Sequence, residues 1–183
     1  MYSVKKMING LVCVALTTFT GSLVHAQEGV WRDSTTGLSW MRCSIGQKWT
    51  GKTCAGEPLK FTWPNALDFA AALNHDGGFA GRTDWRVPTI DELSTIRKCS
   101  SGWGRGRATL PNGQSVPKEC AAGSSRPTLN TSIFPNTKDS FYWSSSPVAN
   151  YRDFAWIVGF GHGYDDHGNK YYNYYVRLVR SSQ

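Results

Sequence analysis

Side chains that could hold an anionic ligand gather in the stretch SSGWGRGRATLPNGQSVPKEC, residues 100–120. A tryptophan between two glycines has few neighbouring side chains to pack on. If exposed, its ring can stack on a sugar while guanidinium groups bind a sulfate or carboxylate. The alternative is that the ring folds back under its own loop. We call residues 97–126 the basic loop, and its expected ligand-binding residues are Trp103, Arg105, Arg107, Lys118 and Arg126.

A second candidate stretch is GFGHGYDDHGNKYYNYYVRLVR, residues 159–180, which contains two histidines and two aspartates. The run Asp165-Asp166-His167-Gly168 lacks the alternate spacing of oxygen ligands that a calcium loop requires. A zinc site needs further ligands, and the other histidines are His25, in the N-terminal apolar segment, and His75. We therefore expect no metal and no cofactor.

The glycines of this second stretch predict a hairpin between two strands that together cover residues 154–180. Its tip is expected to display Tyr164, Lys170, Tyr171 and Asn173. Tyrosine and asparagine are typical of recognition loops, because tyrosine gives contact area at low entropic cost. The tyrosines could equally serve packing.

No residue pattern predicts catalysis. The serines of WSSSP, residues 143–147, are not set in a nucleophile turn of the G-x-S-x-G type. In DWRVPTIDEL, residues 84–93, Thr89 and Glu92 match a helix capping box, so the charged residues of this motif have structural roles. The chain is expected to be non-enzymatic.

Several elements must position these residues. The pattern predicts a hairpin over 30–41 with Leu38 and Trp40 on one face, and amphipathic helices over 62–75 and 89–98. Long loops follow over 99–136, and then a meander of strands from residue 141. This order predicts an α+β fold, a compact, loop-rich single domain in which two helices pack on a short antiparallel sheet.

The N-terminus has the layout of a secretory signal peptide. Lys5 and Lys6 precede an apolar run that ends in the small-residue sequence Val24-His25-Ala26. We expect a signal peptide over residues 1–26, a single mature domain over 27–183, and a secreted or periplasmic location. No later run is long and apolar enough for a membrane span.

The expected mature chain keeps four cysteines, an even number that favours two disulfides in an exported protein. Three pairings of Cys43, Cys54, Cys99 and Cys120 are conceivable. We favour Cys43–Cys54 and Cys99–Cys120, because each closes a local loop that lacks periodic structure of its own.

The positive charge of the protein is concentrated in the basic loop. The formal net charge is +7. The loop holds six basic residues and a single acidic one, Glu119, so it accounts for the whole excess that remains after signal-peptide removal. A local positive field outside the cytoplasm favours acidic polysaccharide, anionic lipid surfaces or extracellular nucleic acid as partners. The alternative is a solvated loop, in which Arg97 and Lys98 complement a helix C-terminus.

Six segments, in this order, resemble the Lcl C-terminal domain family: TGLSWMRC, FTWPNALDFAAALN, GRTDWRVPTIDEL, YWSSSP, FAWIVGF and YYVRLVR, which span residues 36–180. The resemblance implies a fold similar to C-type-lectin-like and formylglycine-generating-enzyme-like domains. For the namesake of the family, a collagen-like adhesin, it also implies trimerisation and binding of sulfated glycosaminoglycans. This chain has no collagen-like Gly-x-y region to enforce a trimer.

We therefore expect an adhesin-like binding module for acidic or sulfated glycans, with homo-trimerisation as its expected form of self-association and no nucleic acid as partner. The alternative is a structural or assembly subunit of an envelope or appendage complex, whose tyrosine-rich hairpin meets a protein partner.

Overall fold

The computed structural model describes residues 29–109, 111–113 and 115–182, so the predicted signal peptide lies outside the described residues. The described chain combines two helices with short strands, as the sequence predicted. In chain order the elements are β1 (Val30–Asp33), β2 (Leu38–Met41), β3 (Lys48–Trp49), β4 (Cys54–Ala55), β5 (Lys60–Phe61), α1 (Trp63–His75), α2 (Ile90–Thr95), β6 (Arg107–Thr109), β7 (Ser115–Pro117), β8 (Phe141–Val148), β9 (Tyr151–Gly159), β10 (Tyr164–Asn169), β11 (Tyr174–Tyr175) and β12 (Val179–Ser181).

The first hairpin forms where the sequence predicted it. Strands β1 and β2 pair in antiparallel register, and β12 joins the other side of β2 to give a three-stranded sheet. The turn is stabilised by Asp33, whose carboxylate accepts hydrogen bonds from the hydroxyls of Thr35 and Thr36 at 2.5 and 2.7 Å. Gly37 closes the turn with a φ of 68°, which a residue with a side chain rarely adopts. Leu38 and Trp40 both reach the same buried cluster.

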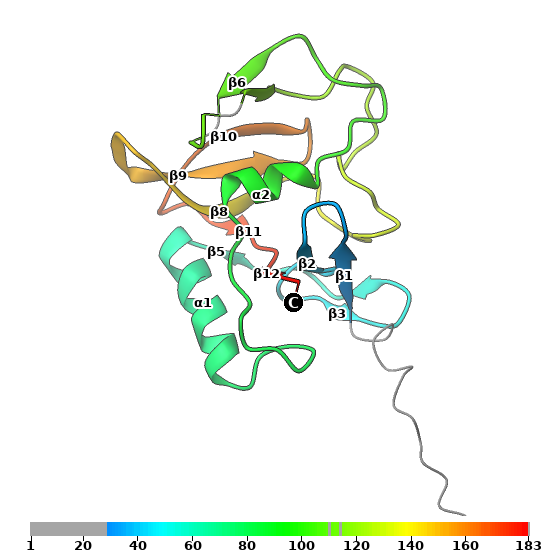
Figure 1. Cartoon of the computed structure of the whole chain (residues 1–183), viewed down its shortest axis with the longest axis vertical. Coiled ribbons are helices and arrows are strands. Elements are labelled where there is room, and N and C mark those ends of the chain that lie inside the picture. The colour runs from blue at the N-terminus through cyan, green and yellow to red at the C-terminus, as the bar shows by residue number, and fades with distance from the viewer. Residues whose placement is uncertain (1–28, 110, 114, 183) are drawn as a thin grey trace, which may run out of the picture.

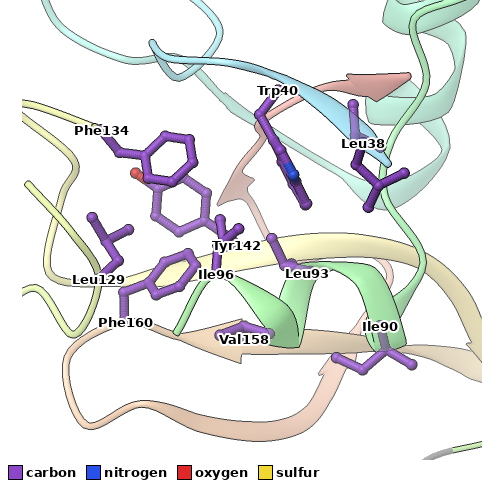
Figure 2. Close-up of a cluster of buried hydrophobic side chains, with 11 residues drawn as sticks. Leu38, Trp40, Ile90, Leu93, Ile96, Leu129, Phe134, Tyr142, Val158 and Phe160 are labelled. Atoms are coloured by element: carbon purple, nitrogen blue, oxygen red, sulfur yellow. The ribbon is translucent and has the colours of Figure 1, made fainter. Parts of the chain in front are cut away.

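The larger sheet has the strand order β10-β9-β8-β11-β5 and separates two hydrophobic clusters. Figure 2 shows the first cluster, in which Tyr142 and Val158 meet side chains of α2. Neighbouring residues Trp143 and Ile157 belong to the second cluster, which includes α1. Because successive strand side chains point to opposite faces, the two helices cover opposite faces of this sheet.

One sequence expectation about this sheet was wrong. The sheet is not wholly antiparallel, because β11 pairs in parallel with β8 through Tyr175 and Tyr142. Strand β9 is buried on both faces: Val158, and Phe160 just after the strand, enter the first cluster, while Ala155 and Ile157 enter the second.

Both helices begin where the sequence predicted, but α2 ends at Thr95, short of the predicted residue 98. Helix α2 has a complete capping box, with the Glu92 amide donating to the Thr89 hydroxyl at 3.2 Å and the Thr89 amide donating to the Glu92 carboxylate at 2.9 Å. Helix α1 starts after Thr62, with Pro64 in its first turn, but the Thr62 side chain makes no capping hydrogen bond. The predicted apolar stripe of α1 packs on the second cluster.

The predicted hairpin over 154–180 is shorter and ends elsewhere. Its strands are β9 and β10, joined by a turn at residues 160–163 in which Gly163 adopts a φ of 66°. After Asn169 the chain leaves the hairpin, because β11 pairs with β8 and β5, and β12 pairs with β2 (Figure 1).

Both predicted disulfides are confirmed. Cys43 bonds Cys54 and Cys99 bonds Cys120, with Cα–Cα distances of 5.4 and 5.1 Å. The two loops are less irregular than predicted, since one contains the β3–β4 ladder and the other the β6–β7 ladder. A disulfide that closes a loop of this size stabilises a fold by about 2–4 kcal/mol.

Candidate ligand-binding site

The basic loop is a narrow two-stranded projection that begins at the Cys99–Cys120 disulfide. Trp103 forms an antiparallel β-bridge with Cys120. Beyond it, the Gly104 amide donates to the Glu119 carbonyl at 2.9 Å, and the Lys118 amide donates to the Gly106 carbonyl at 2.8 Å. The glycines allow this close approach. A Cβ atom on Gly104 would lie 3.2 Å from the Glu119 carbonyl oxygen, and one on Gly106 would lie 3.2 Å from the Lys118 side chain. The Gly-x-Gly spacing therefore serves strand pairing and displays the residues between.

Trp103 is half exposed, at 45% of its surface. One face of its ring lies on the guanidinium of Arg97, whose central carbon is 5.2 Å from the ring centroid. The indole is therefore neither a free ring nor a plug under the loop. A supported aromatic face that remains open to solvent suits stacking, because the ring keeps its orientation without a ligand.

Arg97 contributes no exposed charge, contrary to its inclusion in the basic field. Its side chain is buried, lies 3.2 Å from the Asp165 carboxylate and donates to the Gly163 carbonyl at 3.0 Å. Burial raises the pKa of Asp165, and the charge of Arg97 partly opposes this. The ion pair links the segment after α2 to β10, and the hydrogen bond to Gly163 links it to the turn between β9 and β10. Together they fix the base of the basic loop.

The other predicted cations of the basic loop are exposed. The side chains of Arg105 and Lys118 have no hydrogen-bonding or ionic partner among the described residues. Arg107 donates to the side chain and the backbone carbonyl of Ser115, at 2.9 and 2.5 Å, so it braces the ladder. Arg126 lies against the ring of His162, with nitrogen distances of 2.9 and 3.1 Å, and 4.0 Å from Asp139.

Acidic side chains limit where an anion can bind on this surface. Tyr164 lies near the basic loop, beside a pocket of about 270 Å³ that Lys118 lines together with Glu119, Asp165 and Asp166. Its ring packs edge-on against Phe141 at 6.0 Å. This pocket is too acidic for a polyanion, so the available positive surface is the Trp103, Arg105 and Arg107 side of the projection.

Lys170 and Tyr171 are not part of this surface, in contrast to the predicted hairpin tip. They follow the far end of β10, because Tyr164 begins that strand and Asn169 ends it. Lys170 donates to the Arg152 carbonyl at 2.6 Å and lies over the Trp63 ring at 4.4 Å. Tyr171 is 74% exposed. The structure therefore divides the predicted binding residues of the hairpin between the two ends of β10.

The hydroxyls of WSSSP are engaged in backbone contacts. Ser144 and Ser145 donate to the carbonyls of Trp156 and Pro88, at 2.7 and 3.2 Å, and Ser146 accepts from the Ile90 amide at 3.0 Å. None of the three has a histidine partner within the described structure. These serines join β8 to β9 and to the start of α2.

Three of the four charged residues of DWRVPTIDEL form two structural ion pairs. Asp84 accepts from Arg180 at 2.7 Å, and Glu92 accepts two hydrogen bonds from Arg86, each 2.6 Å long. Arg86 also pairs through its backbone with Val179 of β12. The motif therefore fixes the C-terminal strand beside the start of α2, in agreement with its structural interpretation.

The histidines and aspartates of residues 162–167 point in different directions. Asp165 is buried against Ser94 and Arg97, whereas Asp166 is exposed. His162 lies on Arg126, and the His167 ring is 4.3 Å from Trp156. Among the described residues, no group of three or more histidines, cysteines, aspartates or glutamates could hold a metal ion.

Sequence reasoning missed one group of cations. Arg32, Arg82 and Arg180 line a common pocket although they come from three separate segments. The one signal that could have linked two of them is the pairing of the first and last strands, which local sequence patterns do not reveal.

No helix in the described part of the chain is long and apolar enough to cross a membrane.

A search of curated proteins finds no match to the chain. The model of the Lcl C-terminal domain matches residues 29–180, which is nearly the whole of the described structure. The match includes both disulfides, both helices and nearly all of the strands. The chain belongs to the Lcl C-terminal domain family.

Proposed function

We propose that this protein is an exported, non-enzymatic binding module that recognises acidic or sulfated polysaccharide through its basic loop. The observation that carries the proposal is the half-exposed Trp103 ring followed two residues later by the exposed Arg105, on a projection anchored by a disulfide. An aromatic face binds a sugar ring by stacking, and a neighbouring guanidinium binds a sulfate or carboxylate by charge-assisted hydrogen bonds.

Other features support export and a lectin-like arrangement. Two formed disulfides are typical of proteins in oxidising compartments outside the cytoplasm. Small sheets with two helices and long loops resemble a C-type-lectin-like fold. In such a fold, the ligand is bound by loops that a rigid scaffold holds in place. The ligand surface that we assign consists of Trp103, Arg105 and Arg107, with Lys118, Arg126 and Tyr164 at its border.

Elution from a heparin column tests this proposal. Replacing Arg105 and Arg107 together by glutamine should move elution to much lower salt. Charges more than about 10 Å away from the bound heparin are largely screened at 0.1 M salt, so the remaining cations cannot replace these two. The free energy of unfolding should change by less than about 1 kcal/mol, since Arg105 has no partner and Arg107 contacts Ser115 of the same ladder. The control replaces Lys48 and Lys52 by glutamine, two exposed lysines in the loop closed by the other disulfide. It removes the same charge as the arginine variant and should shift elution far less.

Trp103→Ala separates stacking from charge. Its loss of affinity should depend less on salt than that of the arginine variant, because stacking is not a charge interaction.

If the arginine variant and the lysine control elute at the same salt, heparin responds to total charge and the basic loop is not a specific site.

A second candidate function rests on the exposed tyrosines at the opposite end of β10. Tyr151, Tyr171 and Tyr172 are 59%, 74% and 61% exposed, and the hydrogen bond from the Lys170 amide to the Asp153 carbonyl brings their segments together. Exposed tyrosines are enriched at protein interfaces. This surface favours the alternative of an assembly subunit or a homo-oligomer, and cross-linking of wild type against a Tyr171→Ser/Tyr172→Ser variant would reveal it.

A further inference from the structure

A pocket outside the basic loop collects three arginines. Its volume is about 310 Å³, and its lining comes from β1, β2, β12 and the loop after α1. Figure 1 shows the β6–β7 hairpin at the upper end of the long axis and the β1–β2–β12 sheet in the lower half. The pocket and the basic loop are therefore separate surfaces.

The strand register brings two of the arginines together. Arg32 of β1 and Arg180 of β12 both pair with Ser39 of β2, one from each side. Directly paired residues point their side chains to the same face, and strands lie about 4.8 Å apart, so these two backbones are roughly 10 Å apart. The opposite face carries Trp40 and Val179 into the core. Both guanidiniums are thus held on the pocket side of the sheet.

The third arginine is presented by a tightly constrained turn. Phe79 and Arg82 exchange two backbone hydrogen bonds, of 2.9 and 3.1 Å. Between them, Ala80 has a φ of 53°, an unfavourable value for a residue with a side chain. A Cβ atom on Gly78 would lie 1.9 Å from the Arg82 carbonyl oxygen, so only glycine fits this position.

Trp85 fixes this turn to the rest of the fold. Its buried indole donates to the Phe79 carbonyl at 2.8 Å, and its backbone makes two hydrogen bonds with the Asn74 side chain, of 2.7 and 3.0 Å. The Arg82 backbone is therefore preorganised, which lowers the entropic cost of binding.

The guanidiniums have unused hydrogen-bonding capacity. Arg180 is 4% exposed, and its Nε donates to Asp84. Its two terminal nitrogens have no partner among the described residues, and neither do the side chains of Arg32 and Arg82. The two terminal nitrogens of Arg180 are not among the described buried side-chain atoms that lack a partner, so they are open to solvent in the pocket and can donate to a ligand.

The charge and shape of the pocket define the class of ligand. Three guanidiniums face one carboxylate, Asp84, which leaves an excess of two positive charges. Val30, Ala80 and Trp85 add an apolar wall. We propose that this pocket binds a small oxyanion with two negative charges, such as a phosphate group or a compact dicarboxylate, whose nonpolar part lies against that wall. Guanidinium groups bind both kinds of anion through paired hydrogen bonds.

Titration calorimetry of the full mature chain at low salt tests the pocket, with inorganic phosphate and succinate as separate probes. At least one should bind, and the tighter of the two identifies the ligand chemistry. Arg32→Gln combined with Arg82→Gln should weaken that probe roughly tenfold or more, because hydrogen bonds to charged groups are lost. The Arg105→Gln/Arg107→Gln variant removes the same charge elsewhere and should bind the probe as the wild type does. This control also keeps the result independent of the polysaccharide proposal.

Asp84→Asn gives a second, opposite test. The amide oxygen can still accept from Arg180, while the excess positive charge of the pocket rises, so the dianion should bind several-fold more tightly. Thermal unfolding without ligand verifies that each variant is folded. If neither dianion binds the wild type, or if the two double variants weaken binding equally, the pocket proposal is overturned.

Discussion

Replacing Asp165 by alanine should lower the free energy of unfolding by about 3–5 kcal/mol. Its carboxylate is buried 3.2 Å from the Arg97 guanidinium and accepts from the Ser94 hydroxyl at 2.8 Å. Removing one partner leaves the other charge buried without compensation, which is far more costly than losing an exposed pair. Denaturant unfolding of the disulfide-bonded protein measures the effect.

Asp166→Ala is the matched control for this variant. It removes the same charge from the adjacent, exposed position and should change stability by less than about 0.5 kcal/mol. Equal effects of the two substitutions would show that the Arg97–Asp165 pair does not stabilise the fold. Because Arg97 also supports the Trp103 ring, the Asp165 variant should in addition bind heparin more weakly.

Replacing Arg177 by methionine should destabilise the protein by roughly 3 kcal/mol or more, because several buried acceptors lose their donor. The guanidinium is fully buried and donates to the carbonyls of Met41 and Arg42 and to the hydroxyls of Ser44 and Thr137. Burial lowers its pKa to about 10, so it remains charged at neutral pH.

Arg152→Met is the control for the loss of a guanidinium, since Arg152 is exposed at the start of β9. It should leave the unfolding midpoint nearly unchanged. A loss below about 1 kcal/mol for Arg177→Met would mean that methionine fills the site as well as arginine does, as occurs when a buried polar network is replaced by good apolar packing.

The sequence predicted those elements whose signals lie within a few residues of each other. The Thr89–Glu92 capping box fixes the start of α2, and Pro64 marks the first turn of α1. The β1–β2 turn depends on Asp33 and Gly37, which are adjacent to the strands they join. The disulfide pairing was also predictable, because closing a short loop costs less entropy than joining distant cysteines.

The candidate binding surface was predictable in part. Trp103, Arg105 and Arg107 lie within five residues, so any fold that exposes this segment presents them together. Arg97 belongs to the same charge cluster in the sequence, yet it is buried. Its position depends on Asp165, which lies in a different strand, and no local pattern specifies that contact.

Contacts between distant segments were decided by the tertiary structure alone. The sequence shows that residues 174–181 are strand-forming, but not that β11 would pair in parallel with β8 while β12 joins β2. Pairing of that kind depends on burying both faces of β9 and on satisfying every backbone group in the sheet. The same long-range register places Arg180 opposite Ser39 and beside Arg32, which is why the three-arginine pocket has no signature in the sequence. Local spacing thus determined the helices, the first turn and the displayed residues of the basic loop, whereas the packing of remote strands decided which charges are buried and which converge.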